Sequence, residues 1–235
     1  YIQLGNDKFY VIDKDGSCDS YYVYDAPFEN EYSMSLEASR PVIRDVPTDY
    51  RTLTSEMYPS ANASVRTNSN LIEFYNDYPV NSNWNLYANA SLSEEARSTL
   101  YPSLRKAIAG KSDYEAVEIL LNFVQTSLEY MTDDEQFGYE RPLFPDESLY
   151  YPYCDCEDRS ILFSVLVREL VGLDVVLLYY PGHLATAVCF NSDVSGDYLT
   201  VGGRKYVVCD PTYINANVGM TMPQYKGVKA EVVRL

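Results

Sequence analysis

The sequence predicts an α+β fold, with helices packed on an antiparallel sheet, because helical patterns come first and strand patterns follow. Between residues 92 and 171, apolar residues recur at a spacing of three or four, as on one face of a helix. From residue 174 onward, short runs of β-branched, aromatic and other apolar residues alternate with turn residues. Segregated helices and antiparallel strands form an α+β domain. We expect a core domain over residues 91–235 and an irregular, β-rich extension over residues 1–90.

Composition and charge restrict the possible partners. The chain has 235 residues, of which 46% are hydrophobic, so it can build one sizeable core and is too apolar for a disordered chain. Thirty-four acidic against eighteen basic residues give a formal charge of −16. This charge repels phosphate backbones, argues against nucleic acid as a partner and favours neutral or cationic substrates. No apolar run is long enough to span a membrane.

Cysteine count and the chain start give an expectation about the compartment. The five cysteines are an odd number, so at least one thiol is free or pairs outside the chain. The sequence starts at Tyr1, without an initiator Met or a leader peptide. We expect a trimmed part of a longer protein that is secreted to the periplasm or the cell surface.

The N-terminal half combines strand and helix signals. Residues 1–30 contain two β-type runs, FYVI and YYVY, around a turn at Asp15-Gly16, which predicts a hairpin. Residues 31–85 are rich in Asn, Ser, Pro and Tyr, and we expect irregular structure with short strands. The segment SLSEEARSTLYPSLRKAIAG predicts a helix that Pro102 splits or kinks.

Two further helices have clearer ends. The segment SDYEAVEILLNFVQTSLEYM starts with Ser112 and Glu115, which can form a capping box, and carries one apolar stripe. An aromatic-rich loop, FGYERPLFPDESLYYPY, leads to a third helix from about Cys156 to Val171, which Gly172 ends. This helix is apolar nearly all round, so we expect it to be buried. Five strands follow, with the sequences DVVLLYY, HLATAVCF, DYLTV, KYVVCD and KAEVVRL.

The candidate catalytic residues are a cysteine, a histidine and an aspartate at the ends of these elements. Cys156 starts the third helix, where the helix dipole and free N–H groups favour a thiolate. His183 is the only histidine of the chain and starts a strand, and Asp210 follows another strand. If these strands are neighbours beside the helix start, the three side chains converge. His183 would then act as the base and Asp210 would hold its tautomer.

Other roles are possible for the same residues. Cys189 and Cys209 are most simply core residues. A zinc site built from Cys154, Cys156, His183 and Cys209 is a further possibility, but C-x-C is not the usual C-x₂-C spacing. The carboxylates that follow Cys156 would raise the pKa of its thiol, although they suit the first turn of a helix.

Three motifs, in order along the chain, resemble the transglutaminase-like branch of the papain-like fold. In that family a cysteine starts a buried helix and is followed two residues later by an acid or aromatic residue, as in Cys156 and Asp158. A histidine then starts a strand, and an aspartate, often in D-P-T, ends the next, as in His183 and Asp210. The match covers about residues 112–214 and does not extend to residues 1–90.

The resemblance implies a papain-like core in which Cys156 attacks an amide carbonyl and forms a thioester. Cross-linking members shield the thioester from water with tryptophans. This chain has one tryptophan, Trp84, outside the matched region. We therefore expect hydrolysis of a peptide or amide bond. Acyl transfer to an amine and a non-catalytic binding or structural domain are the alternatives.

Further residues follow from this mechanism. The oxyanion needs two donors, for which we expect the Cys156 backbone N–H and, by analogy with papain-like enzymes, the Gln125 side chain. We expect tyrosines to line the substrate cleft, three from the loop before Cys156 and one from the strand before His183: Tyr150, Tyr151, Tyr153 and Tyr180. No phosphate-binding glycine loop is present. We expect a protein or peptide substrate and neither a metal nor another cofactor.

Overall fold

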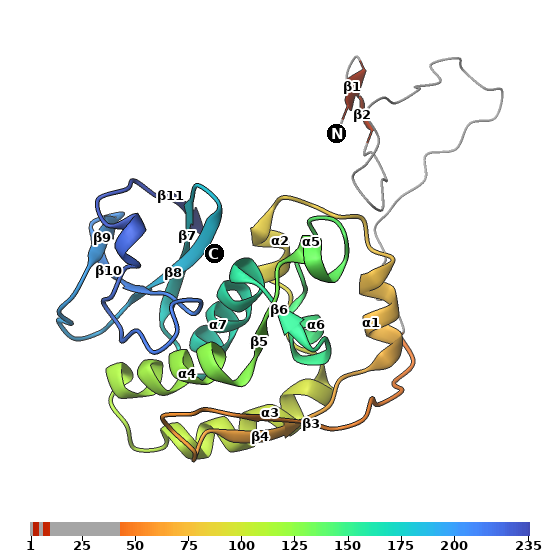
Figure 1. Cartoon of the computed structure of the whole chain (residues 1–235), viewed down its shortest axis with the longest axis horizontal. Helices are drawn as coiled ribbons and strands as arrows, with labels where there is room; N and C mark the ends of the chain where they lie inside the picture. The colour runs from red at the N-terminus through yellow and green to blue at the C-terminus, as the bar shows by residue number, and fades with distance from the viewer. Residues whose placement is uncertain (1, 5–6, 10–42) are drawn as a thin grey trace.

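The computed structural model describes residues 2–4, 7–9 and 43–235 (Figure 1). The described helices are α1 (Ser69–Asn76), α2 (Trp84–Ala88), α3 (Glu94–Ile108), α4 (Asp113–Ser127), α5 (Asp133–Gln136), α6 (Pro145–Tyr150), α7 (Cys156–Leu170) and the 3-10 helix η1 (Pro223–Tyr225). The described strands are β1 (Ile2–Leu4), β2 (Asp7–Phe9), β3 (Arg51–Thr54), β4 (Asn62–Val65), β5 (Glu129–Tyr130), β6 (Tyr153–Cys154), β7 (Asp174–Tyr180), β8 (His183–Cys189), β9 (Tyr198–Val201), β10 (Arg204–Cys209) and β11 (Glu231–Arg234). The turn predicted at Asp15-Gly16 lies outside the described residues.

Five strands form an antiparallel sheet in the order β11-β7-β8-β10-β9. β8 lies in the middle, and all seven of its residues are buried. Cys209 of β10 pairs with Thr186 of β8, and the side chain of Thr186 donates a hydrogen bond to the Cys209 carbonyl. The end of β10 therefore lies beside the beginning of β8, which brings Asp210 toward His183.

Helices cover one face of this sheet, as an α+β fold requires (Figure 1). α7 packs on β7 and β8, and α4 packs on α7. The main core joins α3, α4 and α7 to the β3–β4 hairpin and to the sheet residues Val175, Val188 and Val207. A second apolar cluster covers the other face of the sheet and includes Ala185 and Ala187.

α7 is buried along most of its length, as its apolar sequence predicts. Gly172, at φ +77°, follows the helix in the left-handed conformation that commonly ends helices. Two buried polar side chains of α7 donate to backbone carbonyls: Ser160 Oγ donates to Leu184 at 2.8 Å, and Arg159 donates to Leu128 at 2.7 Å. The Ser160 contact fixes the first turns of α7 against the start of β8.

The structure differs from the sequence predictions at three points. α3 continues through Pro102 without a break. The segment 43–90 is not simply β-rich, because it contains α1 and α2 beside the β3–β4 hairpin. The side chains of Asn68 and Asn83 cap these two helices, so residues that suggested irregular structure in fact start helices. The aromatic loop before Cys156 contains α6, with Pro145 in its first turn.

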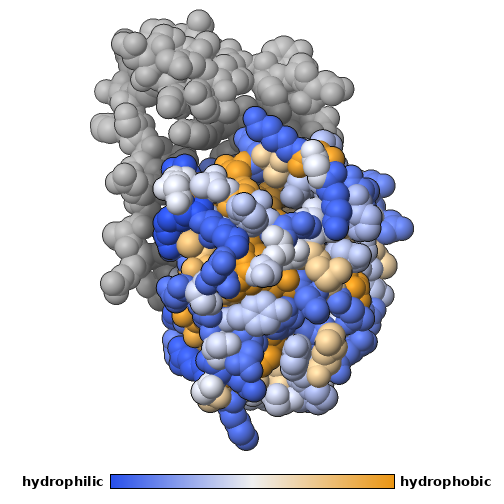
Figure 2. Space-filling view, turned by 90° about the vertical axis from the view of Figure 1, so that its left-hand side faces the viewer, coloured by the Kyte–Doolittle hydropathy of each residue, from blue (hydrophilic) through white to orange (hydrophobic). Residues whose placement is uncertain are grey.

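One face of the described part is largely hydrophilic (Figure 2). Figure 2 shows a narrow band of hydrophobic residues bordered by hydrophilic ones, on the side of the molecule that carries the outer strands. None of the described helices combines the length and apolar composition that a bilayer span requires.

Candidate active site

His183 and Asp210 form a buried pair at one end of the sheet. The His183 Nε2 atom lies 2.9 Å from Asp210 Oδ2, and both side chains are almost inaccessible. β8 begins at His183, and β10 ends one residue before Asp210. When Nε2 carries the proton and donates to the carboxylate, Nδ1 is the nitrogen that can accept a proton. Nδ1 forms no hydrogen bond with another described residue.

The turn after β10 holds Asp210 in place. Asp210 Oδ1 accepts the N–H groups of Thr212 and Tyr213 at 3.0 and 3.2 Å, a common arrangement for Asp at a turn. The Gln125 side chain of α4 secures the same turn, because its Nε2 lies 3.0, 2.8 and 3.1 Å from the carbonyl oxygens of Asp210, Tyr213 and Ala216. The amide hydrogens of Gln125 face these carbonyls, so the predicted oxyanion role would require those contacts to break.

Cys156 lies at the first position of α7, as predicted, but its thiol is directed at a carboxylate. Its Sγ donates to Glu157 Oε2 at 3.0 Å, and no hydrogen bond joins it to His183 within the described part of the chain. The side chain is half-buried and packs against an apolar cluster that includes Leu184, the residue after His183. The nucleophile candidate is therefore beside β8, with its thiol hydrogen-bonded to Glu157.

The electrostatic surroundings of Cys156 oppose a thiolate. Burial raises the pKa of the Cys156 thiol, and the nearby carboxylates of Glu157 and Asp155 raise it further. The Leu184 backbone acts in the opposite direction, but its effect is smaller. The low pKa that the helix dipole predicts is therefore absent from this arrangement. Burial also raises the pKa of Cys154, to about 12.

Four buried carboxyl groups surround the start of α7: Asp133, Asp155, Glu157 and Asp158. Burial, with repulsion from Asp155, raises the pKa of Asp133 to about 7 and that of Glu157 to about 11. Burial also raises the pKa of Asp155 and of Asp158. The first-turn acids that the sequence suggested are thus buried rather than solvated.

Aromatic rings enclose His183 on the face of the sheet opposite α7. The Tyr225 ring stacks on the imidazole at a centroid distance of 4.9 Å and an interplanar angle of 6°. Tyr180 stacks on Tyr225 in turn, also at 4.9 Å. The two tyrosines line a cavity of about 570 Å³ whose lining includes neither Cys156 nor His183. The cavity therefore adjoins the His183 side of the site without reaching the thiol.

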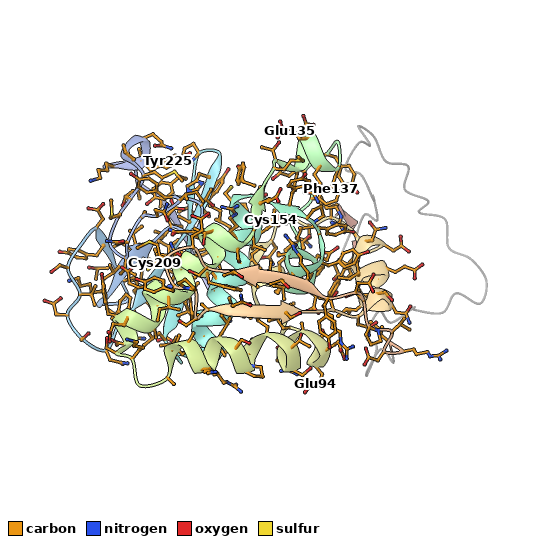
Figure 3. The ribbon with its side chains drawn as sticks, turned by 60° about the horizontal axis from the view of Figure 1, so that its bottom comes forward. Glu94, Glu135, Phe137, Cys154, Cys209 and Tyr225 are labelled. Atoms are coloured by element: carbon orange, nitrogen blue, oxygen red, sulfur yellow. The ribbon has the colours of Figure 1, made fainter. Side chains whose placement is uncertain are left out.

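The predicted cleft tyrosines do not form one wall. Tyr180 lies beside His183, whereas Tyr151 packs edge-on against Phe137 and Tyr150. Tyr153 belongs to the short strand β6. Figure 3 shows Tyr225 on the sheet side of the molecule and Phe137 on the helical side. These two aromatic groups therefore belong to different regions of the surface.

The alternative zinc site is not assembled. Cys154 donates to the Glu129 carbonyl and Cys209 to the Val207 carbonyl. Within residues 43–235, the groups of side chains close enough to share a metal include Cys156 with carboxylates, but not Cys154, His183 or Cys209. The four residues considered as zinc ligands from the sequence therefore do not come together.

Two residues of the site, Tyr225 and Asp133, were not predicted from the sequence. Tyr225, the last residue of η1, stacks on His183 from 42 residues further along the chain, and no local pattern marks it. Asp133 reaches the start of α7 from α5. Its only signal is the acidic run TDDE, which equally suits an exposed helix start.

Comparison with known proteins does not assign this site. No protein-family model matches the chain, and no curated protein matches it. Its function has to follow from its residues and their geometry.

Proposed function

We propose that this protein hydrolyses a peptide or amide bond by cysteine catalysis, on a core of the transglutaminase-like branch of the papain-like fold. Cys156 is the nucleophile, His183 the general base and Asp210 the residue that orients the base. The proposal rests on the buried His183–Asp210 pair, whose atoms lie 2.9 Å apart. Leu184, the residue after His183, accepts a hydrogen bond from Ser160 of α7 at its backbone carbonyl, so the pair lies close to α7. A pair of this kind fixes the imidazole tautomer and stabilises the imidazolium.

The reaction begins when the Cys156 thiol gives its proton to His183 Nδ1 and the sulfur attacks the carbonyl carbon. The C–N bond of the tetrahedral intermediate then breaks, and the amine leaves with the proton from His183. Water adds to the resulting thioester while His183 accepts its proton. The carboxylic acid leaves, and Cys156 regains a proton. The Cys156 backbone N–H has no partner within the helix and can donate to the oxyanion.

This mechanism requires the Cys156 side chain to turn from Glu157 toward His183. The present contact with Glu157 at 3.0 Å and the raised pKa of the thiol favour a second candidate, a non-catalytic binding domain that keeps the fold. Acyl transfer to an amine shares the thioester with hydrolysis and differs only in the group that attacks it.

The test is incubation of the protein with a peptide library, with and without a primary amine, followed by mass spectrometry. Wild type and Cys189→Ser are expected to cleave or deamidate peptides, and Cys156→Ser is expected to be inactive. Cys189 is a suitable control because it is buried on the far face of the sheet from α7. Incorporation of the amine would identify an acyltransferase. If wild type neither turns over a peptide nor forms a covalent adduct, the non-catalytic binding domain is the candidate that remains.

A further inference from the structure

Three buried aspartates converge where α5 meets the start of α7. One carboxylate oxygen from each of Asp133, Asp155 and Asp158 lies within 4.8 Å of the other two. The exposed fractions of these residues are 2%, 6% and 0%. Asp133 is the first residue of α5, whereas Asp155 is the N-cap of α7 and Asp158 lies in its first turn. Two segments that are separate in sequence thus present three carboxylates to one enclosed point.

No basic side chain of the described chain forms an ion pair with these three carboxylates. The nearest buried arginines are used elsewhere: Arg141 pairs with Glu147, and Arg159 donates to the Gln125 and Leu128 carbonyls. Backbone N–H groups satisfy part of the cluster, since Asp133 accepts from Arg141 and Asp158 accepts from Leu143 and Asp155. Buried carboxylates without a cationic partner are costly unless they bind a metal or a proton.

Asp155 provides an independent sign of a missing ligand. Its Oδ1 atom is buried and has no hydrogen-bond partner, although the residue is only 6% exposed. Asp155 also belongs to a second group, with Cys156 and Glu157, and Asp133 to a third, with Glu140 and Glu157. Further oxygen ligands therefore lie directly beside the three aspartates.

We propose that Asp133, Asp155 and Asp158 bind a divalent cation that prefers oxygen ligands, with Ca²⁺ as the best fit. Ca²⁺ takes six to eight oxygens at about 2.3–2.6 Å, so ligands on opposite sides of the ion are about 4.6–5.2 Å apart. One carboxylate oxygen of each aspartate lies within 4.8 Å of the other two, so the three oxygens are close enough to contact one such ion. Mg²⁺ demands near-ideal octahedral geometry and usually keeps several waters, so an enclosed cluster of protein carboxylates suits it less well. The bound ion would tie α5 to the first turn of α7, which also carries Cys156.

The test is calorimetric titration of EDTA-treated protein with CaCl₂, together with melting curves at increasing Ca²⁺. The site does not depend on the proposed hydrolase, and binding is measured without any substrate. Wild type is expected to bind one Ca²⁺ and to melt at a higher temperature as Ca²⁺ rises. Asp155→Asn is expected to bind at least about tenfold more weakly, because affinity follows ligand charge. Asn is as good an N-cap as Asp, so α7 keeps its start.

Asp134→Asn is the matched control, because it removes the same charge from the neighbouring exposed residue. It is expected to bind Ca²⁺ like wild type. Asp133→Asn provides a second ligand variant if circular dichroism shows that Asp155→Asn is misfolded. Three results would overturn the proposal. The first is that wild type does not bind Ca²⁺ at millimolar concentration, and the second is that wild type and both ligand variants bind equally. The third is that Asp155→Asn stabilises the protein while the melting temperature does not respond to Ca²⁺, which would mean that the carboxyl groups hold protons instead.

Discussion

The Gln125 side chain offers a quantitative test of how the chain holds Asp210 in place. Its amide nitrogen lies 3.0, 2.8 and 3.1 Å from three backbone carbonyls of the turn that follows β10. An amide NH₂ group has two hydrogens, so two of the three carbonyls can each accept a full hydrogen bond from it. Gln125→Ala should therefore leave two buried acceptors without a donor, at a cost of about 1–3 kcal/mol each.

A compensating gain reduces this cost. Gln125 Oε1 is buried without a partner, and the substitution removes that unfavourable group. The free energy of unfolding is expected to fall by about 2–4 kcal/mol in total. Two carbonyls lose their hydrogen bonds and the side chain loses its packing, whereas removal of the unpartnered Oε1 atom offsets part of this loss. Gln125→Glu should lose at least as much, because a carboxylate would face carbonyl oxygens.

Urea unfolding measures this effect, with the slope of the transition compared between variants. Gln224→Ala is the control, because Gln224 is exposed and should change the free energy of unfolding by less than about 0.5 kcal/mol. Amide hydrogen exchange at Thr212 and Tyr213 should speed up in Gln125→Ala alone. Equal stability of Gln125→Ala and Gln224→Ala would refute the supporting role of Gln125.

Two further substitutions test the packing around the site. Glu147→Ala leaves Arg141 buried without its partner and should lower the free energy of unfolding by about 3–5 kcal/mol, measured by thermal or urea unfolding. Glu94→Ala, which breaks an exposed pair, is the control and should cost less than about 1 kcal/mol. Equal losses for the two variants would contradict the importance of the buried pair. Gly196→Ala would place a Cβ atom 2.4 Å from the Gly219 Cα atom, at φ +129°, so its melting temperature should fall, corresponding to a loss of about 2 kcal/mol or more. An unchanged melting temperature would show that the two chain segments do not meet as described.

Elements whose signals are local could be predicted from the sequence. Ser112 and Glu115 form the expected capping box of α4, and the apolar run after Cys156 forms the expected buried helix. The alternation of side chains along a strand places Ala185 and Ala187 on one face of β8. The prediction that His183 and Asp210 meet was conditional on neighbouring strands. The structure supplies that condition, because β10 pairs with β8 and the end of one strand lies beside the start of the other.

Features that depend on tertiary contacts could not be predicted. Gln125 is an ordinary helical residue in sequence, and only the return of the chain after β10 places three carbonyls against it. The orientation of the Cys156 thiol toward Glu157 depends on a side-chain rotation that no sequence pattern determines. The stacking of Tyr225 on His183 is likewise a tertiary contact, made by η1 after the chain has passed through β9 and β10.

The most direct measurement of the central claim is covalent labelling of the intact protein with a peptide that carries a thiol-reactive group in place of the scissile amide. Mass spectrometry should find a single adduct, on Cys156, in wild type. His183→Gln should slow this labelling at least about a hundredfold, because a general base contributes about 10²–10⁴-fold, whereas labelling of the urea-unfolded chains should be equal. Labelling of Cys156 at the same rate in wild type and His183→Gln, or preferential labelling of another cysteine, would contradict the assignment of Cys156 and His183 as nucleophile and base.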